Sequence, residues 1–161
     1  MNLCFFALLS AALASTTPAH PQAPTQPIPY SHKLHVALGL KCQDCHEMPA
    51  PGDTMTLPQT PKCMTCHSSI GAGRPAIEKL KAYVQQKRPI PWARVYEIPS
   101  FVIFSHKTHL DAGVKCESCH GPVAQRDHLW RETPLSMAWC VNCHREKKAT
   151  TDCGSCHQLQ D

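Results

Sequence analysis

One short motif, Cys-x-x-Cys-His, occurs five times in this chain of 161 residues and limits what the chain can fold into. The copies, numbered here as motifs 1 to 5, are Cys42–His46, Cys63–His67, Cys116–His120, Cys140–His144 and Cys153–His157. They use ten of the eleven cysteines, namely Cys42, Cys45, Cys63, Cys66, Cys116, Cys119, Cys140, Cys143, Cys153 and Cys156. The remaining cysteine, Cys4, lies in an apolar segment near the N-terminus.

The spacing of the motif is the one that attaches c-type haem. Two thiols three residues apart lie on the same side of a helical turn, where they can add to the two vinyl groups of one porphyrin. The histidine that follows then lies under the ring and can bind the iron. We therefore predict five covalently bound haems, with these proximal iron ligands: His46, His67, His120, His144 and His157.

Zinc sites and disulfides are the two alternatives for a chain rich in cysteine. Structural zinc needs sets of four ligands, commonly two Cys-x-x-Cys pairs or a pair followed by spaced histidines. A disulfide framework gives no reason for a histidine after every second cysteine. Because a histidine follows the pair in all five copies, the pattern favours haem over both alternatives.

An internal repeat supplies candidates for the opposite, distal side of the iron. Residues 31–46 and 105–120 match at nine of sixteen positions without a gap. Each copy starts with His-x-x-His, and the four histidines are His32, His35, His106 and His109. Histidines three apart occupy one helical turn but diverge, so each pair can reach two haems. We predict that the first histidine of each pair binds the iron of motif 1 or motif 3, respectively.

The composition predicts a fold of mainly coil with short α-helices, organised by its haems. Fifteen prolines, seven glycines and scattered aliphatic residues are poor material for a conventional core. One ordinary amphipathic helix is expected from Pro75 to Lys87, because Ile77, Leu80 and Val84 recur at helical spacing. We expect this helix to pack between the two repeats.

We divide the chain into four parts. Residues 1–14 have the short apolar run and small-x-small ending of a secretory signal peptide, with an uncleaved anchor as the alternative. Residues 15–30, which hold five prolines, read as a poorly ordered tether. Residues 31–104 form a dihaem repeat with a connecting helix, and residues 105–161 form a trihaem module. Export agrees with c-type haem, which is attached outside the cytoplasm, and we expect a periplasmic location.

The formal net charge of +4 would by itself suggest an anionic partner. Each ferric haem adds about one negative charge, because two propionates outweigh the charge of the iron porphyrin. Five haems would therefore bring the total to about −1. The charge gives no reason to expect a nucleic-acid partner.

The order of His-x-x-His and Cys-x-x-Cys-His resembles that of the class III multihaem cytochromes, and residues 106–157 resemble their trihaem members. A longer resemblance covers residues 30–157. This stretch is similar to the pentahaem cytochrome subunit of alternative complex III and to related subunits of quinone reductase complexes. The matching segments include Pro89–Tyr96, Phe101–His106 and Leu135–Cys140.

The trihaem resemblance implies that His35 and His109 bind the irons of motifs 2 and 4. It also implies a distal ligand for motif 5 just before motif 4, where Met137 stands. The pentahaem family would have Met near position 126, and this chain has Arg126 there, with His128 close by. Met137 is the predicted ligand and His128 the alternative.

Three classes of function can be considered for such a chain. An electron carrier fits best, since every iron can then have two axial ligands. A multihaem reductase would need an iron with an open position and acid–base groups around it, and a haem-free metal or structural protein would leave the motifs unexplained. The resemblance implies redox partners, including a membrane complex that oxidises quinol or reduces quinone, with possible peripheral membrane association.

Overall fold

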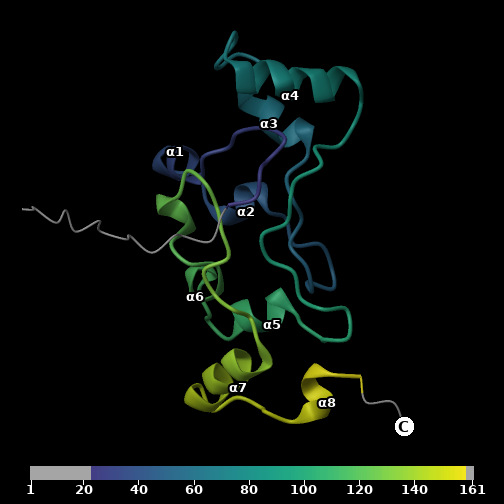
Figure 1. Ribbon diagram of the computed structural model, residues 1–161, viewed down its shortest axis with the longest axis vertical. Helices are drawn as coiled ribbons and strands as arrows, with labels where there is room; N and C mark the ends of the chain where they lie inside the picture. The colour runs from purple at the N-terminus through teal and green to yellow at the C-terminus, as the bar shows by residue number, and fades with distance from the viewer. Residues whose placement is uncertain (1–22, 159–161) are drawn as a thin grey trace, which may run out of the picture.

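The computed structural model describes residues 23–158, so the predicted signal peptide and the first part of the tether lie outside the described residues. Within them, eight short α-helices and one 3₁₀ helix are joined by long coil segments (Figure 1). The helices are α1 His32–Ala37, α2 Cys42–Cys45, α3 Thr60–His67, α4 Pro75–Gln85, α5 His106–Asp111, α6 Cys116–His120, η1 Val123–Gln125, α7 Met137–Glu146 and α8 Cys153–Cys156. This confirms the predicted fold class of mainly coil with short helices.

Serine caps start the helices that carry the predicted distal ligands. The Ser31 hydroxyl accepts a hydrogen bond from the Leu34 amide at 3.1 Å, and the Ser105 hydroxyl accepts one from the Thr108 amide at 3.3 Å. Each cap satisfies a backbone N–H that has no partner within its helix. The serine shared by both repeats therefore fixes where each His-x-x-His turn begins.

Helix α4 is the amphipathic helix predicted from the sequence. It begins at Pro75, in the first turn where the missing N–H costs nothing. Its buried residues are Ile77 and Leu80, while Val84 is 36% exposed. Leu80 packs in a small cluster with Ile28 and Ile90, and Cys63 and Trp92 contact this cluster. The helix lies over α3 at one end of the molecule, so the expectation that it packs between the two repeats is wrong (Figure 1).

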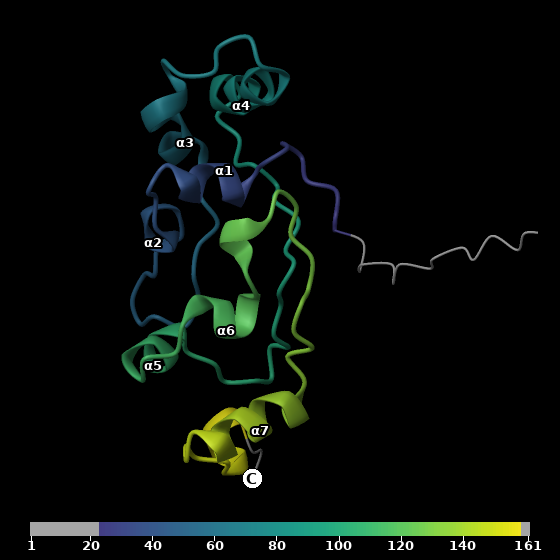
Figure 2. The same ribbon diagram turned by 90° about the vertical axis from the view of Figure 1, so that its left-hand side faces the viewer.

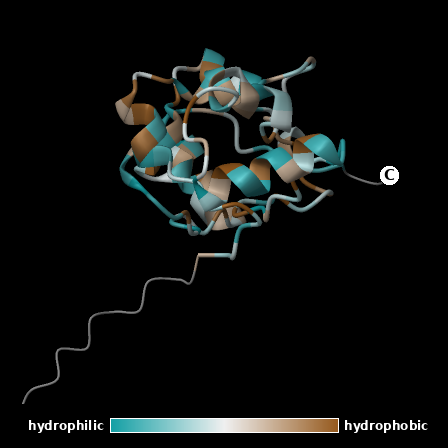
Figure 3. Ribbon diagram, turned by 90° about the horizontal axis from the view of Figure 1, so that it is seen from above, coloured by the Kyte–Doolittle hydropathy of each residue, from teal (hydrophilic) through white to brown (hydrophobic). Residues whose placement is uncertain are grey.

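Apolar side chains are otherwise spread over the molecule rather than gathered in a core. In the described residues, the buried hydrophobic side chains are Ile28, Ile77, Leu80 and Ile90. Figure 3 shows brown and teal residues alternating on the helices without a continuous apolar layer. No helix in this part of the chain is long and apolar enough to cross a membrane. Protein side chains alone thus bury little apolar surface, as the composition predicted.

Residues 23–30 differ from the poorly ordered tether expected there. The Gln26 side chain forms two hydrogen bonds with the backbone of Ala93, at 2.9 and 3.0 Å. Ile28 is 6% exposed. Because an amide side chain can pair with both the N–H and the C=O of one extended residue, Gln26 docks this segment much as a neighbouring strand would. The proline content predicted a poorly ordered segment, whereas this contact depends on a residue 67 positions away.

The helices follow one another along the long axis of the molecule. From one end to the other in Figure 1, α4 and α3 come first, then α1 and α2, then α5 and α6, and finally α7 and α8. Figure 2, turned by 90°, shows the same succession. The five motifs are therefore spread along one axis, and the coil segments run beside them.

Candidate functional site

Every motif lies on, or at the end of, a short helix. Motif 1 forms α2, motif 2 the second half of α3, motif 3 forms α6, motif 4 lies in α7, and motif 5 forms α8. A helical turn places the two cysteines of a motif on the same side, as attachment to one porphyrin requires. All ten motif cysteines are free thiols rather than disulfides.

The first histidine of each repeat faces the histidine of the next motif. The ring centroids of His32 and His46 lie 6.4 Å apart with planes 4° from parallel, and those of His106 and His120 lie 6.4 Å apart with planes 6° from parallel. Two imidazoles that bind one iron from opposite sides hold their centres ~6 Å apart, since metal–imidazole bonds are about 2 Å long. Both pairs fit an axial pair on a haem iron.

The second histidine of each repeat faces a more distant motif. His35 lies 6.1 Å from His67, with ring planes at 68°, and His109 lies 5.9 Å from His144, with ring planes at 50°. The structure thus brings together the four pairs that the repeat and the trihaem resemblance suggested. Their separations fit an iron between each pair, and the ring planes of these two pairs are rotated away from parallel.

Backbone carbonyls hold the imidazoles by one nitrogen. The Nδ1 atoms of His35 and His109 lie 2.8 Å from the carbonyl oxygens of Ser31 and Ser105, one turn earlier in the same helix. The other Nδ1–carbonyl contacts join His46 to Thr56 at 2.8 Å, His67 to Ile70 at 3.0 Å, His106 to Asp53 at 2.8 Å and His144 to Thr150 at 2.6 Å. An Nδ1–H that donates to a carbonyl leaves Nε2 as the free ligand atom, which fits haem ligation.

Burial keeps two of these imidazoles neutral. It lowers the pKa of His32 to about 4, with a further contribution from the nearby His46 ring. It also lowers the pKa of His120, which faces His106. Only a neutral imidazole has a lone pair to give to iron, so the surroundings favour the ligating form.

The donor sets do not fit the zinc alternative. Within residues 23–158, no three His, Cys, Asp or Glu side chains come together as a metal site. Structural zinc requires four converging ligands, whereas here the His32–His46 and His106–His120 pairs stand face to face at about the separation that an iron porphyrin needs.

The motifs stand in a spatial order that differs from their order in the chain. In Figure 1 the helices that carry the motifs succeed one another as α3, α2, α6 and then α7 with α8. Burial raises the pKa of five motif thiols, and a thiol of another motif raises each of them further: Cys45 with Cys66, Cys63 with Cys45, Cys116 with Cys42, Cys119 with Cys143, and Cys140 with Cys156. These neighbours agree with an order in space of motif 2, 1, 3, 4, 5. We call this succession the motif column.

Motif 5 is tied to the segment just before the second repeat. The Ile103 amide donates to the Cys156 carbonyl at 2.8 Å, and Val102 forms an isolated bridge with His157. The Phe101 ring lies 6.0 Å from the His157 ring, with planes at 23°. Residues 101–103 thus hold the proximal histidine of motif 5 in place.

The two candidates for the distal ligand of motif 5 lie in different regions. Met137 is the first residue of α7, which lies beside α8 at the same end of the molecule in Figures 1 and 2, and its side chain is 67% exposed. The residues just before His128 bond to the start of α1, through Lys33 N to Arg126 O at 3.0 Å and Ser31 Oγ to Asp127 Oδ1 at 2.6 Å. Among the described contacts none joins His157 to either candidate, so Met137 stays a prediction.

One aromatic position was missed by the sequence reasoning. Tyr30 stacks on His35 at 4.4 Å and meets the edge of His32 at 4.8 Å. Phe104 makes the same contacts in the second repeat: it stacks on His109 at 4.6 Å and meets the edge of His106 at 4.9 Å. The signal was present, because an aromatic residue precedes Ser-His in both repeats. The repeat therefore begins one residue earlier than its matching letters suggest.

Comparison with protein families finds two matches, one for each repeat. Residues 34–91 match the family described as cytochrome c3, and residues 102–158 match the family described as cytochrome c7 and related cytochrome c. The two matches do not overlap, and each covers less than half of the chain. No curated protein matches the chain. Both families fit the histidine pairs and the motif helices described above.

Proposed function

On the premise that this chain is a multihaem c-type cytochrome and an electron carrier, we propose that it carries five haems in the periplasm. It links a membrane complex that oxidises quinol or reduces quinone to periplasmic redox proteins. The observation that carries the proposal is the motif column, in which each motif helix has another beside it along the long axis (Figure 1).

The count of five haems rests on five complete motifs. Each one presents two cysteines on a helical turn and a histidine directly after them. Four of the five proximal histidines have a second imidazole opposite them at 5.9 to 6.4 Å. A chain that bound fewer than four haems would leave such a pair without an iron to hold, and the fifth haem rests on the complete motif at Cys153–His157.

When bound, haem supplies reversible one-electron chemistry, and its potential depends on axial ligands, hydrogen bonds and burial. The chain contributes the arrangement: carbonyl groups orient the imidazoles, burial favours the neutral form of His32 and His120 by lowering their pKa, and the helices keep neighbouring motifs close. Electron transfer slows steeply with distance, so a close succession of sites favours passage from one end of the column to the other. The two ends, at α3 and at α8, are the places where partners would exchange electrons.

Met137 is the proposed distal ligand for motif 5. It begins a helix that lies beside α8, whereas the chain just before His128 is bonded to α1. A thioether donor gives iron a higher potential than a second imidazole does. The motif-5 end of the column would then hold an electron most firmly, which suits an exit to an acceptor.

The first experiment counts and places the haems. The protein is produced with haem attachment in the periplasm, and its mass and pyridine haemochrome spectrum are measured. We expect five haems per chain and recovery with the periplasmic or membrane-associated fraction. Four or fewer haems in fully matured protein, or recovery only from the cytoplasm, would contradict the proposal.

A second experiment tests the column as a path. Membranes that oxidise a quinol are mixed with the wild-type protein and with a Cys153→Ala/Cys156→Ala variant, which lacks the motif-5 haem at one end. We expect the variant to be reduced by one partner but to pass electrons on to the other far more slowly. If both exchanges run at the wild-type rate, the column is not the path.

Carbon monoxide binding to the native protein would reveal an open iron and argue for a reductase instead.

A further inference from the structure

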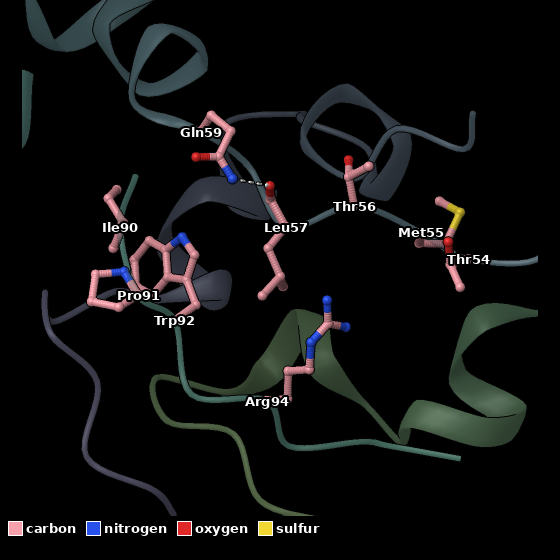
Figure 4. A pocket seen from close by; sticks show the side chains of 9 residues that line it. All are labelled: Thr54, Met55, Thr56, Leu57, Gln59, Ile90, Pro91, Trp92 and Arg94. Atoms are coloured by element: carbon pink, nitrogen blue, oxygen red, sulfur yellow. Dashed lines mark hydrogen bonds between the residues drawn. The ribbon is translucent and has the colours of Figure 1, made fainter. Parts of the chain in front are cut away.

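We propose that Arg94 binds a propionate of the haem held by motif 1, an inference that rests on the proposed function. The observation behind it is a cavity of about 440 Å³ between residues 54–59 and residues 90–94 (Figure 4). Arg94 is the charged residue among those that line it, and its guanidinium points across the cavity toward Leu57 and Thr56.

One wall of this cavity contacts motif 1. The Thr56 carbonyl oxygen lies 2.8 Å from Nδ1 of His46, the motif-1 histidine. The opposite wall is anchored by Trp92, whose indole N–H donates to the Pro58 carbonyl at 3.1 Å. The two walls are therefore held together by a direct hydrogen bond, and the cavity keeps its position next to the motif-1 imidazole.

Residues 90–96 run along the motif column. Ile90 packs in the cluster that Cys63 of motif 2 contacts. The Tyr96 hydroxyl donates to the carbonyl of His120 in motif 3, at 3.3 Å, and its ring lies 4.7 Å from the His120 ring. Arg94 stands between these two points, and motif 1 lies between motifs 2 and 3 in the column. Arg94 is thus level with motif 1.

The direction of the haem follows from its chemistry. The vinyl groups that join the cysteines lie on one edge of the porphyrin, and the two propionates lie on the opposite edge. Motif 1 carries its cysteines on α2, and Figure 2 shows α2 and residues 90–96 on opposite sides of the molecule. A porphyrin attached to Cys42 and Cys45 therefore directs its propionates toward the segment that carries Arg94.

A haem propionate carries a negative charge. A carboxylate removed from water needs a compensating cation or strong hydrogen bonds. The planar guanidinium of arginine can give a carboxylate two parallel hydrogen bonds. Within residues 23–158, no hydrogen bond or ion pair engages the Arg94 side chain, in contrast to Arg126, which binds Glu132 at 2.8 Å. Arg94 is the cation available to a propionate in this cavity.

The test replaces the arginine and measures potentials as well as haem content. Arg94→Gln removes the charge, Arg94→Lys keeps it, and Arg88→Gln removes a charge from the exposed turn after α4 as a matched control. Haem content and absorption spectra are recorded first, and redox titrations are followed by electron paramagnetic resonance to resolve the haems. An unpaired propionate stabilises ferric iron, so losing its cation lowers the potential.

We expect Arg94→Gln to keep five haems while the reduction equilibrium constant of one haem falls about tenfold, which is ~59 mV for one electron. In Arg94→Lys this equilibrium constant should fall by less, and in Arg88→Gln it should match the wild type. Unchanged potentials in Arg94→Gln, or an equal shift in Arg88→Gln, overturn the assignment while five haems still support the proposed function.

A second readout covers the case in which Arg94→Gln does not mature. Infrared difference spectra between the reduced and oxidised protein are recorded for the wild type and Arg94→Lys. A shift of one carboxylate band in Arg94→Lys supports the contact, because the band senses the hydrogen bonds of the propionate. Identical carboxylate bands in the two proteins overturn it.

Discussion

The imidazole rings of His32 and His46 face each other at 6.4 Å with planes only 4° from parallel. His35, one helical turn later, faces His67 at 6.1 Å with planes at 68°. The second repeat keeps the same contrast, with 6° for His106 and His120 and 50° for the next pair. Each His-x-x-His turn therefore presents one parallel and one rotated axial pair.

This contrast predicts two classes of ferric haem. Parallel imidazoles separate the iron orbitals that share the unpaired electron and give a rhombic low-spin signal, whereas strongly rotated imidazoles give a highly anisotropic one. We expect both signals, in comparable amounts, in the low-temperature electron paramagnetic resonance spectrum of the oxidised protein. A spectrum with a single bis-imidazole signal would show that the ring planes differ from those in the structure.

His109→Ala removes the predicted distal ligand of motif 4. The cysteines stay in place, so five haems should remain attached while one of them becomes high spin. Optical and resonance Raman spectra measure the change. Thr108→Ala, an exposed position on the same helix, is the control and should stay fully low spin. A low-spin His109→Ala with no substitute ligand would remove His109 from the ligand set.

Met137→Leu tests the distal ligand of motif 5. If the thioether binds iron, the wild type shows a near-infrared sulfur-to-iron charge-transfer band, and the variant loses it and gains a high-spin haem. His128→Ala should leave the band intact, because its chain neighbours bond to α1 rather than to α8. A wild type with only bis-imidazole signatures, together with a spectral change in His128→Ala, would assign the role to His128.

Tyr30→Leu removes the ring that stacks on His35 at 4.4 Å. Without this contact the imidazole can rotate more freely, so we expect the signal of one strongly rotated haem to broaden or shift. Tyr30→Phe keeps the stacking and should retain the wild-type spectrum, which separates packing from the hydroxyl. Equal spectra for all three proteins would mean that the ring does not orient His35.

Haem removal should unfold the chain. In the described residues the buried hydrophobic side chains are few and lie mainly near α4, so the protein contributes little core of its own. Small metal domains that rely on their ligand lose their fold with it. The chain produced in the cytoplasm without haem attachment should give a circular dichroism spectrum of mostly disordered chain and no cooperative melting. A cooperative transition would show that the side chains suffice.

The sequence determined the local chemistry of this protein. Motif spacing, the aligned His-x-x-His turns and the helical period of Ile77 and Leu80 depend only on residues a turn or two apart, so they can be read without a fold. The class of mainly coil with short helices followed from the scarcity of aliphatic residues for the same reason. The pairing of His32 with His46 could also be predicted from the sequence, because both histidines belong to one repeat.

Tertiary structure alone decided what depends on contacts between distant parts of the chain. The motif column runs 2, 1, 3, 4, 5 because motif 1 of the first repeat lies next to motif 3 of the second. Cys42 and Cys116 are neighbours at this point. Gln26 binds Ala93 across 67 positions and turns part of an expected tether into structure. Ring angles, and the cavity that sets Arg94 beside motif 1, likewise arise only when separate segments pack, because the local pattern carries no information about which segments will meet.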